Sequence, residues 1–194
     1  MSKGPLVILS GPSGSGKSTV IRRLLDGSGL PLRLSVSATT RQPRPNEVDG
    51  VHYHFWTPVR FQQELARDGF LEWATVYGNS YGTLRSEVAP YRERGWGVIL
   101  DIDVQGAAQV RGRCPDSVSV FLRPPSLEEL ERRLRLRRTE DDAAVARRLA
   151  AARRELERAG EYDYQVVNDD LDRAVAELRA LVAKLFPGED RHAG

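Results

Sequence analysis

A glycine-rich stretch near the N-terminus constrains this chain more than any other feature. It reads Gly11-Pro12-Ser13-Gly14-Ser15-Gly16-Lys17-Ser18-Thr19. The apolar run at residues 6–9 just before it predicts a buried parallel strand, and apolar residues at helical spacing from 20 to 25 predict a helix just after it. A strand, a glycine-rich turn and a helix start are the context that a G-x-x-x-x-G-K-[ST] phosphate loop requires. A merely flexible turn is the alternative, and the two flanking elements argue against it.

The chemistry of this loop follows from its residue types. Glycines let the backbone N–H groups point inward, and the helix N-terminus adds partial positive charge, so a polyphosphate is cradled there. We expect Lys17 to reach the β- and γ-phosphates of a nucleoside triphosphate and the Ser18 hydroxyl to ligate Mg²⁺. The chain has 29 basic residues and almost all are arginines, so a lysine at this position suggests a need for a compact ammonium group.

Length, charge and cysteine content narrow the class of protein. The 194 residues can hold one α/β domain with an inserted lobe. A formal net charge of +2 is too small to indicate a nucleic-acid partner. The single Cys114 excludes an internal disulfide and suits a reducing cytosol, so we expect a cytoplasmic location. We expect no membrane association, because no run approaches a membrane span and the first residues lack the apolar core of a signal peptide.

The order of predicted elements indicates the architecture. Strands expected at residues 6–9, 32–36, 98–103, 118–122 and about 166–167 alternate with helices, which predicts a parallel sheet flanked by helices, of the P-loop NTPase type. We assign residues 1–36 and 95–194 to this core domain, with a helical lid at about 126–155. The segment 37–94 is strand-rich and reads as a small inserted lobe.

Helix starts are marked by two capping patterns. Thr57 followed by Pro58 predicts the start of a short helix in the inserted segment. Ser126 opens a helix of the lid, and Glu129 three residues later completes the pattern of a capping box.

A second anion site should face the phosphate loop if the chain transfers a phosphate. Arg41 and Arg44 lie three residues apart in a loop stiffened by prolines, and Tyr53 and Tyr81 could add neutral donors to the same phosphate. Taken singly, each arginine would be interpreted as a surface residue and each tyrosine as a core residue.

Glu72 stands inside the otherwise apolar strand predicted at residues 70–74. Strand alternation could turn its carboxylate toward solvent. The alternative is a carboxylate aimed at a pair of donors, such as the N1–H and N2–H₂ edge of guanine, which adenine lacks. The residue pattern leaves both interpretations open.

His52 and His54 would share one face of a strand. No third ligand of suitable type lies near them in sequence, so we favour an exposed strand face over a metal site.

Two runs are far more specific than the phosphate loop: Ser37-Ala38-Thr39-Thr40-Arg41-Gln42-Pro43-Arg44 and Leu100-Asp101-Ile102-Asp103-Val104-Gln105-Gly106. Together with residues 11–19, 72–73, 78–83 and 167–169, they give a chain that resembles the guanylate kinase family. The resemblance runs from about residue 6 to residue 186, nearly the whole chain.

The resemblance implies transfer of the γ-phosphate of ATP to GMP, giving ADP and GDP, with Mg²⁺ as cofactor and residues 37–94 as the GMP-binding lobe. It implies that the guanine base is read by Ser37, Glu72, Thr83 and Asp103. The residues implied to hold the GMP phosphate are Arg41, Arg44, Tyr53 and Tyr81. Asp101 would lie beside the Mg²⁺ and the acceptor, Arg137 and Arg148 would be lid arginines that reach the ATP phosphates, and Asn168 and Asp169 would lie beside the adenine.

Phosphoryl transfer depends on positioning and charge neutralisation more than on covalent catalysis by the protein. The GMP phosphate is already largely a dianion at neutral pH, so no general base is required. The difficulty is repulsion between two anionic substrates, and the catalytic set expected to offset it is Lys17, Arg44, Arg137 and Arg148.

Two departures from the family pattern concern turns. Arg138 stands where the family commonly has a glycine, which puts the lid geometry in question. Asn46 replaces another usual glycine, and because asparagine tolerates left-handed backbone angles we expect that turn to survive.

Two other functions compete with this interpretation. A non-catalytic scaffold module of the same fold would have a degraded phosphate loop, whereas this loop is intact. A kinase for a ribose bisphosphate would not need the guanine-reading set. The chain is expected to act as a monomer or homo-oligomer on small-molecule substrates.

Overall fold

A computed structural model describes residues 2–76, 78–136 and 142–186, and its main feature is a five-stranded parallel sheet. The strand order is β2-β7-β1-β8-β9, and every neighbouring pair is parallel. The strands are β1 (Leu6–Ser10), β2 (Leu32–Leu34), β7 (Gly97–Asp101), β8 (Ser117–Arg123) and β9 (Tyr164–Val167). β1 is buried along its whole length, as its apolar sequence predicts for a central parallel strand.

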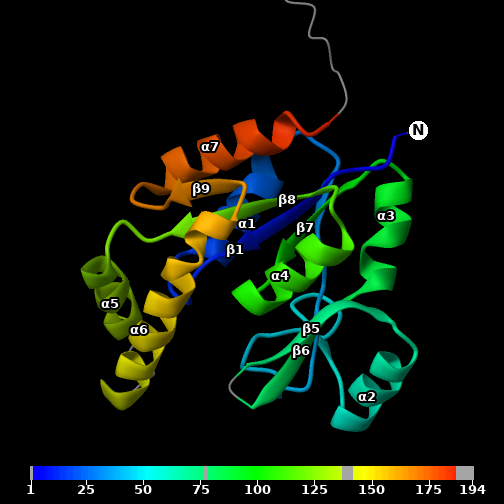
Figure 1. Ribbon diagram of the computed structural model, residues 1–194, viewed down its shortest axis with the longest axis horizontal. Helices are drawn as coiled ribbons and strands as arrows, with labels where there is room; N and C mark the ends of the chain where they lie inside the picture. The colour runs from blue at the N-terminus through cyan, green and yellow to red at the C-terminus, as the bar shows by residue number, and fades with distance from the viewer. Residues whose placement is uncertain (1, 77, 137–141, 187–194) are drawn as a thin grey trace, which may run out of the picture.

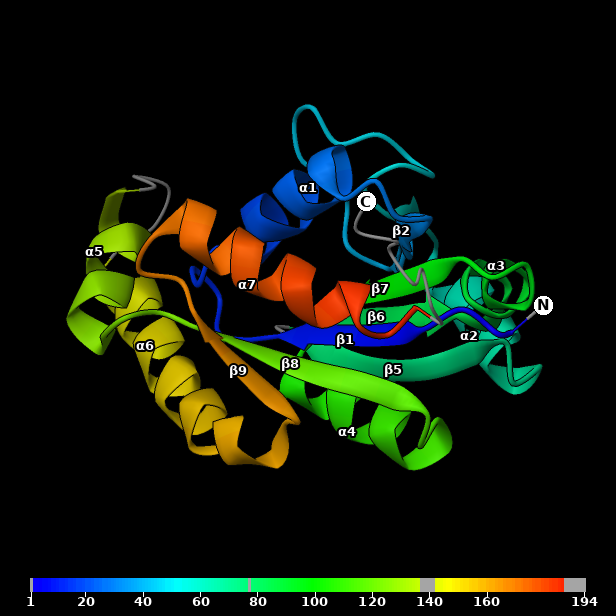
Figure 2. The same cartoon turned by 90° about the horizontal axis from the view of Figure 1, so that it is seen from above.

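Helices cover both faces of this sheet (Figures 1 and 2). On one face α1 (Lys17–Gly27) and α7 (Leu171–Ala183) pack side by side, and Val20, Leu24 and Leu178 form a core with the strands. On the other face lie α3 (Ala89–Glu93) and α4 (Val104–Arg113), where Ala107 and Val110 pack into a second core. The prediction of a parallel sheet flanked by helices is therefore confirmed.

A second, four-stranded sheet follows β2 in the chain. Its order is β4-β3-β6-β5, formed by β3 (Ala38–Thr39), β4 (His54–Phe55), β5 (Phe70–Val76) and β6 (Asn79–Leu84). The helix α2 (Pro58–Ala66) packs on this sheet through Phe61, whose ring stacks 4.4 Å from that of Phe70. The chain then returns to the first sheet through the 3₁₀ turn η1 (Arg85–Glu87) and α3.

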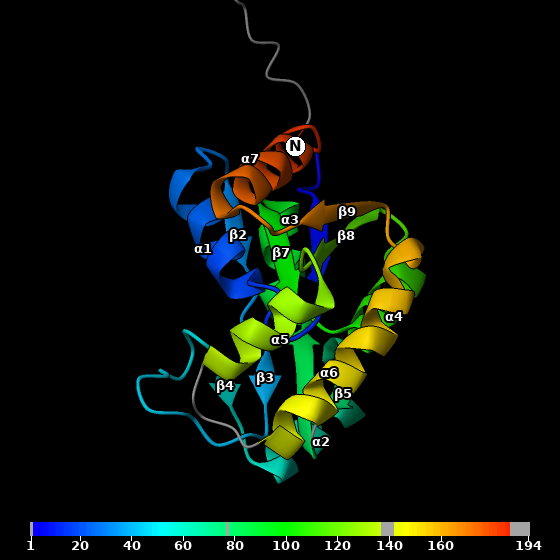
Figure 3. The ribbon, with the colours of Figure 1, turned by 90° about the vertical axis from the view of Figure 1, so that its left-hand side faces the viewer.

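Two helices form an antiparallel arm after β8. They are α5 (Leu127–Leu136) and α6 (Asp142–Glu157), and Leu130, Leu134, Val145 and Ala152 form their shared core. The 3₁₀ turn η2 (Ala159–Glu161) connects α6 to β9. Figures 1 and 3 show that this arm and the second sheet extend from the same end of the five-stranded sheet. No helix in the described ranges is long and apolar enough to cross a membrane.

The capping predictions are confirmed at Thr57, whose hydroxyl accepts the Arg60 N–H at 3.2 Å, and at Ser126, whose hydroxyl accepts the Glu129 N–H at 3.1 Å. The Glu129 carboxylate does not complete the capping box, because it accepts hydrogen bonds from the guanidinium groups of Arg132 and Arg133 instead.

Two strands end earlier than the sequence predicts. β2 ends at Leu34, and β7 ends at Asp101. The reason in the second case is helix capping: the Asp103 side chain accepts the N–H groups of Gln105 and Gly106 and starts α4. The turn at Asn46 survives as expected, with a φ of 70°.

Candidate functional site

The phosphate loop between β1 and α1 borders a cavity of about 740 Å³. Gly14 and Gly16 adopt φ angles of 94° and 96°, which only glycine adopts readily. A Cβ on Gly11 would lie 2.2 Å from the Leu122 carbonyl oxygen, so the loop also needs glycine for close packing on β8. No side chain in the described part of the chain caps α1, so its first N–H groups remain available to an anion.

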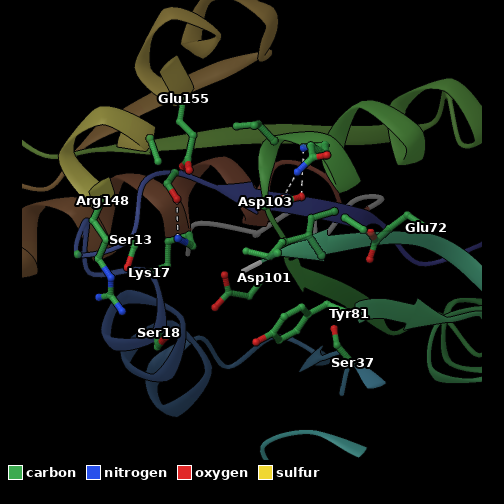
Figure 4. A pocket seen from close by; sticks show the side chains of 18 of the residues that line it. Ser13, Lys17, Ser18, Ser37, Glu72, Tyr81, Asp101, Asp103, Arg148 and Glu155 are labelled. Carbon is green, nitrogen blue, oxygen red and sulfur yellow. Dashed lines mark hydrogen bonds between the residues drawn. The ribbon is translucent and has the colours of Figure 1, made fainter. Parts of the chain in front are cut away.

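Lys17 lies within this loop. Its ammonium donates a hydrogen bond to the Gly11 carbonyl at 2.6 Å (Figure 4). Asp101, at the end of β7, faces the start of α1. Burial raises the pKa of its carboxyl, while the Lys17 charge and a hydrogen bond from Ser18 oppose that rise. Lys17, Ser18 and Asp101 all line the cavity, as expected of a triphosphate site with a cation beside it.

The loop is supported from β9 by Asn168. The Asn168 side chain is 6% exposed and donates a hydrogen bond to the Ser15 carbonyl at 2.7 Å. A Cβ on Gly16 would lie 2.3 Å from the same amide nitrogen. The neighbouring Asp169 is exposed and forms an ion pair with Arg173. The structure thus places Asn168 under the phosphate loop, and its contact with adenine stays a prediction.

Glu72 is buried at the opposite end of the cavity. Its side chain is 4% exposed, and one carboxylate oxygen accepts the Thr83 N–H at 3.0 Å and the Thr83 hydroxyl at 2.6 Å. A Cβ on Gly106 would lie 2.4 Å from the other carboxylate oxygen, so α4 covers this side of β5. Burial raises the pKa of Glu72 to about 7, against the hydrogen bonds from Thr83. The solvent-facing interpretation of Glu72 is therefore wrong, because α4 shields the strand.

The other residues expected to read a base are close by. Ser37 and Asp103 line the cavity beside Glu72. Thr83 is fully buried and reaches the cavity through Glu72. Asp103 has a structural task as well, since one of its oxygens accepts the Gly106 N–H at 2.8 Å and caps α4. In Figure 4, Ser37 and Glu72 lie at one end of the site and Lys17 at the other.

Three of the four residues expected to hold a second phosphate border the same cavity, and Arg41 is not among its lining residues. Arg44, Tyr53 and Tyr81 line the cavity, and the two tyrosine rings are 6.0 Å apart. Burial raises the pKa of Tyr53 to about 12, so its hydroxyl stays a neutral donor.

Arg41 is organised by Glu47, a residue that the sequence analysis missed. The two side chains form a bidentate pair with both N–O distances at 2.9 Å, and Glu47 also accepts the Arg44 N–H at 2.7 Å. The Arg41 hydrogen bonds lower the pKa of Glu47, so the pair is ionised at neutral pH. Glu47 follows Arg44 by three residues within a charged loop, and this spacing was a signal in the sequence for the pairing.

The α5–α6 arm contributes Arg148 and Glu155 to the cavity lining. Figure 4 shows Glu155 pointing from α6 toward Lys17. Burial raises the pKa of Glu155, and the Lys17 charge opposes the rise. Glu155 was not predicted as a site residue, although its spacing of seven residues from Arg148 places both on one helix face. Arg137 and Arg138 lie outside the described residues.

The two histidines do not form the expected exposed strand face. His54 is half-buried, and its Nε2 lies 3.1 Å from a Glu87 carboxylate oxygen. His52 precedes β4, and its Nδ1 accepts the Val48 N–H. Among the described residues, no group of three or more His, Cys, Asp or Glu side chains is placed to hold a metal ion.

Comparison with known proteins gives one consistent result. The family model described as guanylate kinase matches residues 3–185. A guanylate kinase of Symbiobacterium thermophilum is 52% identical over 181 residues, which cover 93% of this chain and 85% of the relative. A guanylate kinase of Synechococcus elongatus is 50% identical over 182 residues, covering 94% and 99% of the two chains. The crystal structure of guanylate kinase from Anaplasma phagocytophilum superposes with a TM-score of 0.80 at 31% identity, covering 97% of this chain and 89% of that one.

Proposed function

The chain belongs to the guanylate kinase family, and from this premise we propose how its cavity carries out the family's reaction. The protein is a nucleoside monophosphate kinase that transfers the γ-phosphate of ATP to GMP, giving ADP and GDP. One observation supports the assignment of roles most directly. The phosphate loop and the buried carboxylate of Glu72 border a single cavity that basic and phenolic side chains also line.

ATP is assigned to the phosphate loop, residues 11–19. The glycine backbone and the N-terminus of α1 would hold the β- and γ-phosphates, and Lys17 would leave the Gly11 carbonyl to contact them. Asn168 supports this function from below, because its hydrogen bond to Ser15 fixes the loop that the phosphates contact. Asn168 and Asp169 remain our candidates for the edge of the adenine site.

Mg²⁺ is the proposed cofactor, and the residues present fit it. Magnesium in phosphate-transfer sites takes one or two protein oxygens and completes its shell with water and substrate phosphate oxygens. The Ser18 hydroxyl and the Asp101 carboxylate are two such oxygens on the same side of the cavity. When bound, the ion would neutralise phosphate charge. Lys17, which faces the Asp101 carboxylate, orients the phosphate chain of ATP toward the acceptor.

GMP is assigned to the cavity end that contains the second sheet. Glu72 in its ionised form accepts two hydrogen bonds from the guanine N1–H and N2–H₂, and Ser37, Thr83 and Asp103 complete the base site. The phosphate is assigned to Arg41, Arg44, Tyr53 and Tyr81. Glu47 holds the Arg41 guanidinium and the backbone N–H of Arg44, which fixes the loop that carries both arginines and so the position from which the phosphate oxygen attacks.

The arm and the second sheet are proposed to close over the substrates. We divide the chain into a core of residues 1–36 and 95–194, a lid at about 126–155, and a GMP-binding lobe of residues 37–94. Closure brings Arg148 and Arg137 onto the ATP phosphates and removes water that would otherwise accept the phosphate. A cytoplasmic location is proposed with this function, since both substrates are free nucleotides.

An acceptor panel tests the assignment. ADP release is measured in a coupled assay with ATP, Mg²⁺ and either GMP, dGMP, AMP or ribose bisphosphate. We expect turnover with GMP and none above background with AMP, because adenine presents no N1–H to the Glu72 carboxylate. In a Glu72→Gln variant, GMP turnover should fall while the ATP affinity stays unchanged. Equal rates with GMP and AMP would rule out Glu72 as the base reader.

A further inference from the structure

A half-buried trio of side chains, Arg33, Glu87 and His54, lies where the second sheet joins the five-stranded sheet. Glu87 of η1 is its centre. One carboxylate oxygen lies 2.6 Å from the Arg33 guanidinium, and the other lies 3.1 Å from Nε2 of His54. The Arg33 guanidinium also donates to the Glu87 backbone carbonyl at 2.9 Å. Arg33 belongs to β2 of the first sheet, and His54 belongs to β4 of the second.

The surroundings make this trio stiffer than a surface ion pair. The exposed fractions of the Arg33, Glu87 and His54 side chains are 19%, 19% and 24%. The Arg33 guanidinium also lies 3.5 Å from the centre of the Tyr91 ring, so it is held on both sides. Burial alone would raise the pKa of Glu87, but the hydrogen bonds from Arg33 and then His54 outweigh it and the pKa is lowered. Glu87 is therefore ionised at neutral pH.

The trio connects the two segments in which the chain passes from one sheet to the other. The chain leaves the first sheet just after Arg33, and α3, which packs on β7 of that sheet, begins just after Glu87, so the contact of Arg33 with Glu87 closes the base of the intervening segment. His54 extends the contact into β4, where its backbone N–H donates to the Ser37 carbonyl at 2.9 Å. Neighbouring side chains on a strand point to opposite faces, so His54 faces Glu87 while Tyr53 faces the cavity.

We propose that Arg33, Glu87 and His54 form a clasp that sets the angle at which the GMP-binding sheet faces the phosphate loop, with Glu87 as a positioning residue for GMP. The clasp acts through Tyr53 and Ser37, the cavity residues that flank it. This inference rests on the assignment of GMP to the second sheet. ATP binds to the phosphate loop of the first sheet, which the clasp does not move.

The consequence is a selective effect on one substrate. Without the clasp, the second sheet samples more orientations, and the fraction of molecules ready to bind GMP falls. The apparent affinity falls by the same factor. Loss of a hydrogen bond to a buried charge should raise the KM for GMP by about three- to tenfold, with the KM for ATP within about twofold of the wild type.

The test compares Glu87→Gln, His54→Phe and His54→Gln in full-length protein. Steady-state kinetics give kcat, KM for GMP and KM for ATP for each, and thermal unfolding confirms that each variant is folded. Glu87→Gln and His54→Phe should raise the KM for GMP, and His54→Gln should restore it because its amide still donates to Glu87. Asp68→Asn is the matched control, since it removes an ion pair with Arg85 that lies within the second-sheet segment.

The outcomes separate this proposal from the assignment of GMP. If the wild-type protein shows no GMP-dependent turnover, the assigned reaction itself fails. If the wild type is active and the clasp variants keep a KM for GMP within about twofold of the wild-type value, the proposed role of the clasp is wrong. A parallel rise in both KM values also overturns it, because that pattern reports general loosening. Should Glu87→Gln fail to fold, His54→Phe and its rescue by His54→Gln decide the question.

Discussion

At the scale of single residues, the base-reading role proposed for the Glu72 carboxylate predicts that recognition of the base depends on pH. Its pKa of about 7 comes from burial under α4, with Thr83 supplying the hydrogen bonds that keep the ionised form accessible. On this assignment guanine, which offers two donors, would pair with the ionised carboxylate and lower the pKa of Glu72 in the bound state. We therefore expect the affinity for guanine to rise with pH up to about 7 and to be constant above it.

Guanosine is the suitable probe for this effect, because it lacks the phosphate that titrates in the same range. Calorimetric titration should show guanosine affinity falling about tenfold for each pH unit below the Glu72 pKa. Thr83→Val should move the midpoint to higher pH, because the lost hydroxyl no longer favours the ionised carboxylate. An affinity that is flat from pH 5.5 to 8.5 in the wild type would contradict the role of Glu72.

The arginines assigned to the substrate phosphates should carry the largest rate effects; Arg44 and Arg148 line the cavity, and Arg137, outside the described residues, is assigned by the family resemblance. Arg44→Ala, Arg137→Ala and Arg148→Ala should each lower kcat by on the order of 10³-fold, by analogy with other phosphoryl-transfer arginines. Arg132→Ala is the control, since its guanidinium pairs with Glu129 on the exposed side of α5. Single-turnover kinetics with saturating substrates measure the effect, and near-normal rates in all three variants would refute the assigned roles.

At the scale of elements, the phosphate loop depends on β9 as well as on its own glycines. Asn168→Ala leaves the buried Ser15 carbonyl without its 2.7 Å donor. The free energy of unfolding should fall by about 1–3 kcal/mol, and ATP should bind more weakly because the loop relaxes. Urea unfolding and ATP titration measure the two effects. Asp169→Asn, which removes only the exposed pair with Arg173, should change the free energy of unfolding by about 1 kcal/mol or less.

Elements that depend on local pattern were predictable from the sequence. β1, the phosphate loop and the Thr57 cap follow from apolar runs, glycine spacing and hydroxyl placement, all of which act within a few residues. The state of Glu72 was not predictable, because it depends on α4, which lies far along the chain and packs over it through Gly106.

Side-chain partners were predicted less well than backbone elements. The Glu129 carboxylate turns to arginines one turn away, and His54 finds Glu87 more than thirty residues later. Glu155 belongs to no sequence motif, and its position beside Lys17 becomes apparent only once α6 is placed in the structure (Figure 4). In each case the missing information is tertiary, since several partners of similar chemistry compete for one side chain.

At the scale of the whole molecule, the cavity is lined by three parts of the chain, which we propose to close over the substrates. The phosphate loop belongs to the five-stranded sheet, Glu72 and Tyr81 to the second sheet, and Arg148 to the α5–α6 arm. On the proposed assignment, Arg44 contacts the GMP phosphate and Arg148 the ATP phosphates, so both nucleotides are needed to draw the two arginines together. Closure should therefore require both substrates, which protects ATP from hydrolysis while GMP is absent.

Small-angle scattering tests this coupling. A non-hydrolysable ATP analogue or GMP alone should reduce the radius of gyration partly, and the two together should reduce it further than the sum of the single effects. Arg148→Ala should bind each nucleotide but lose the additional compaction, because the cation that bridges the arm to the phosphates is gone. Full compaction with the ATP analogue alone would contradict the argument. The enzyme would then close on ATP without its acceptor, and ATP hydrolysis in the absence of GMP should be correspondingly fast.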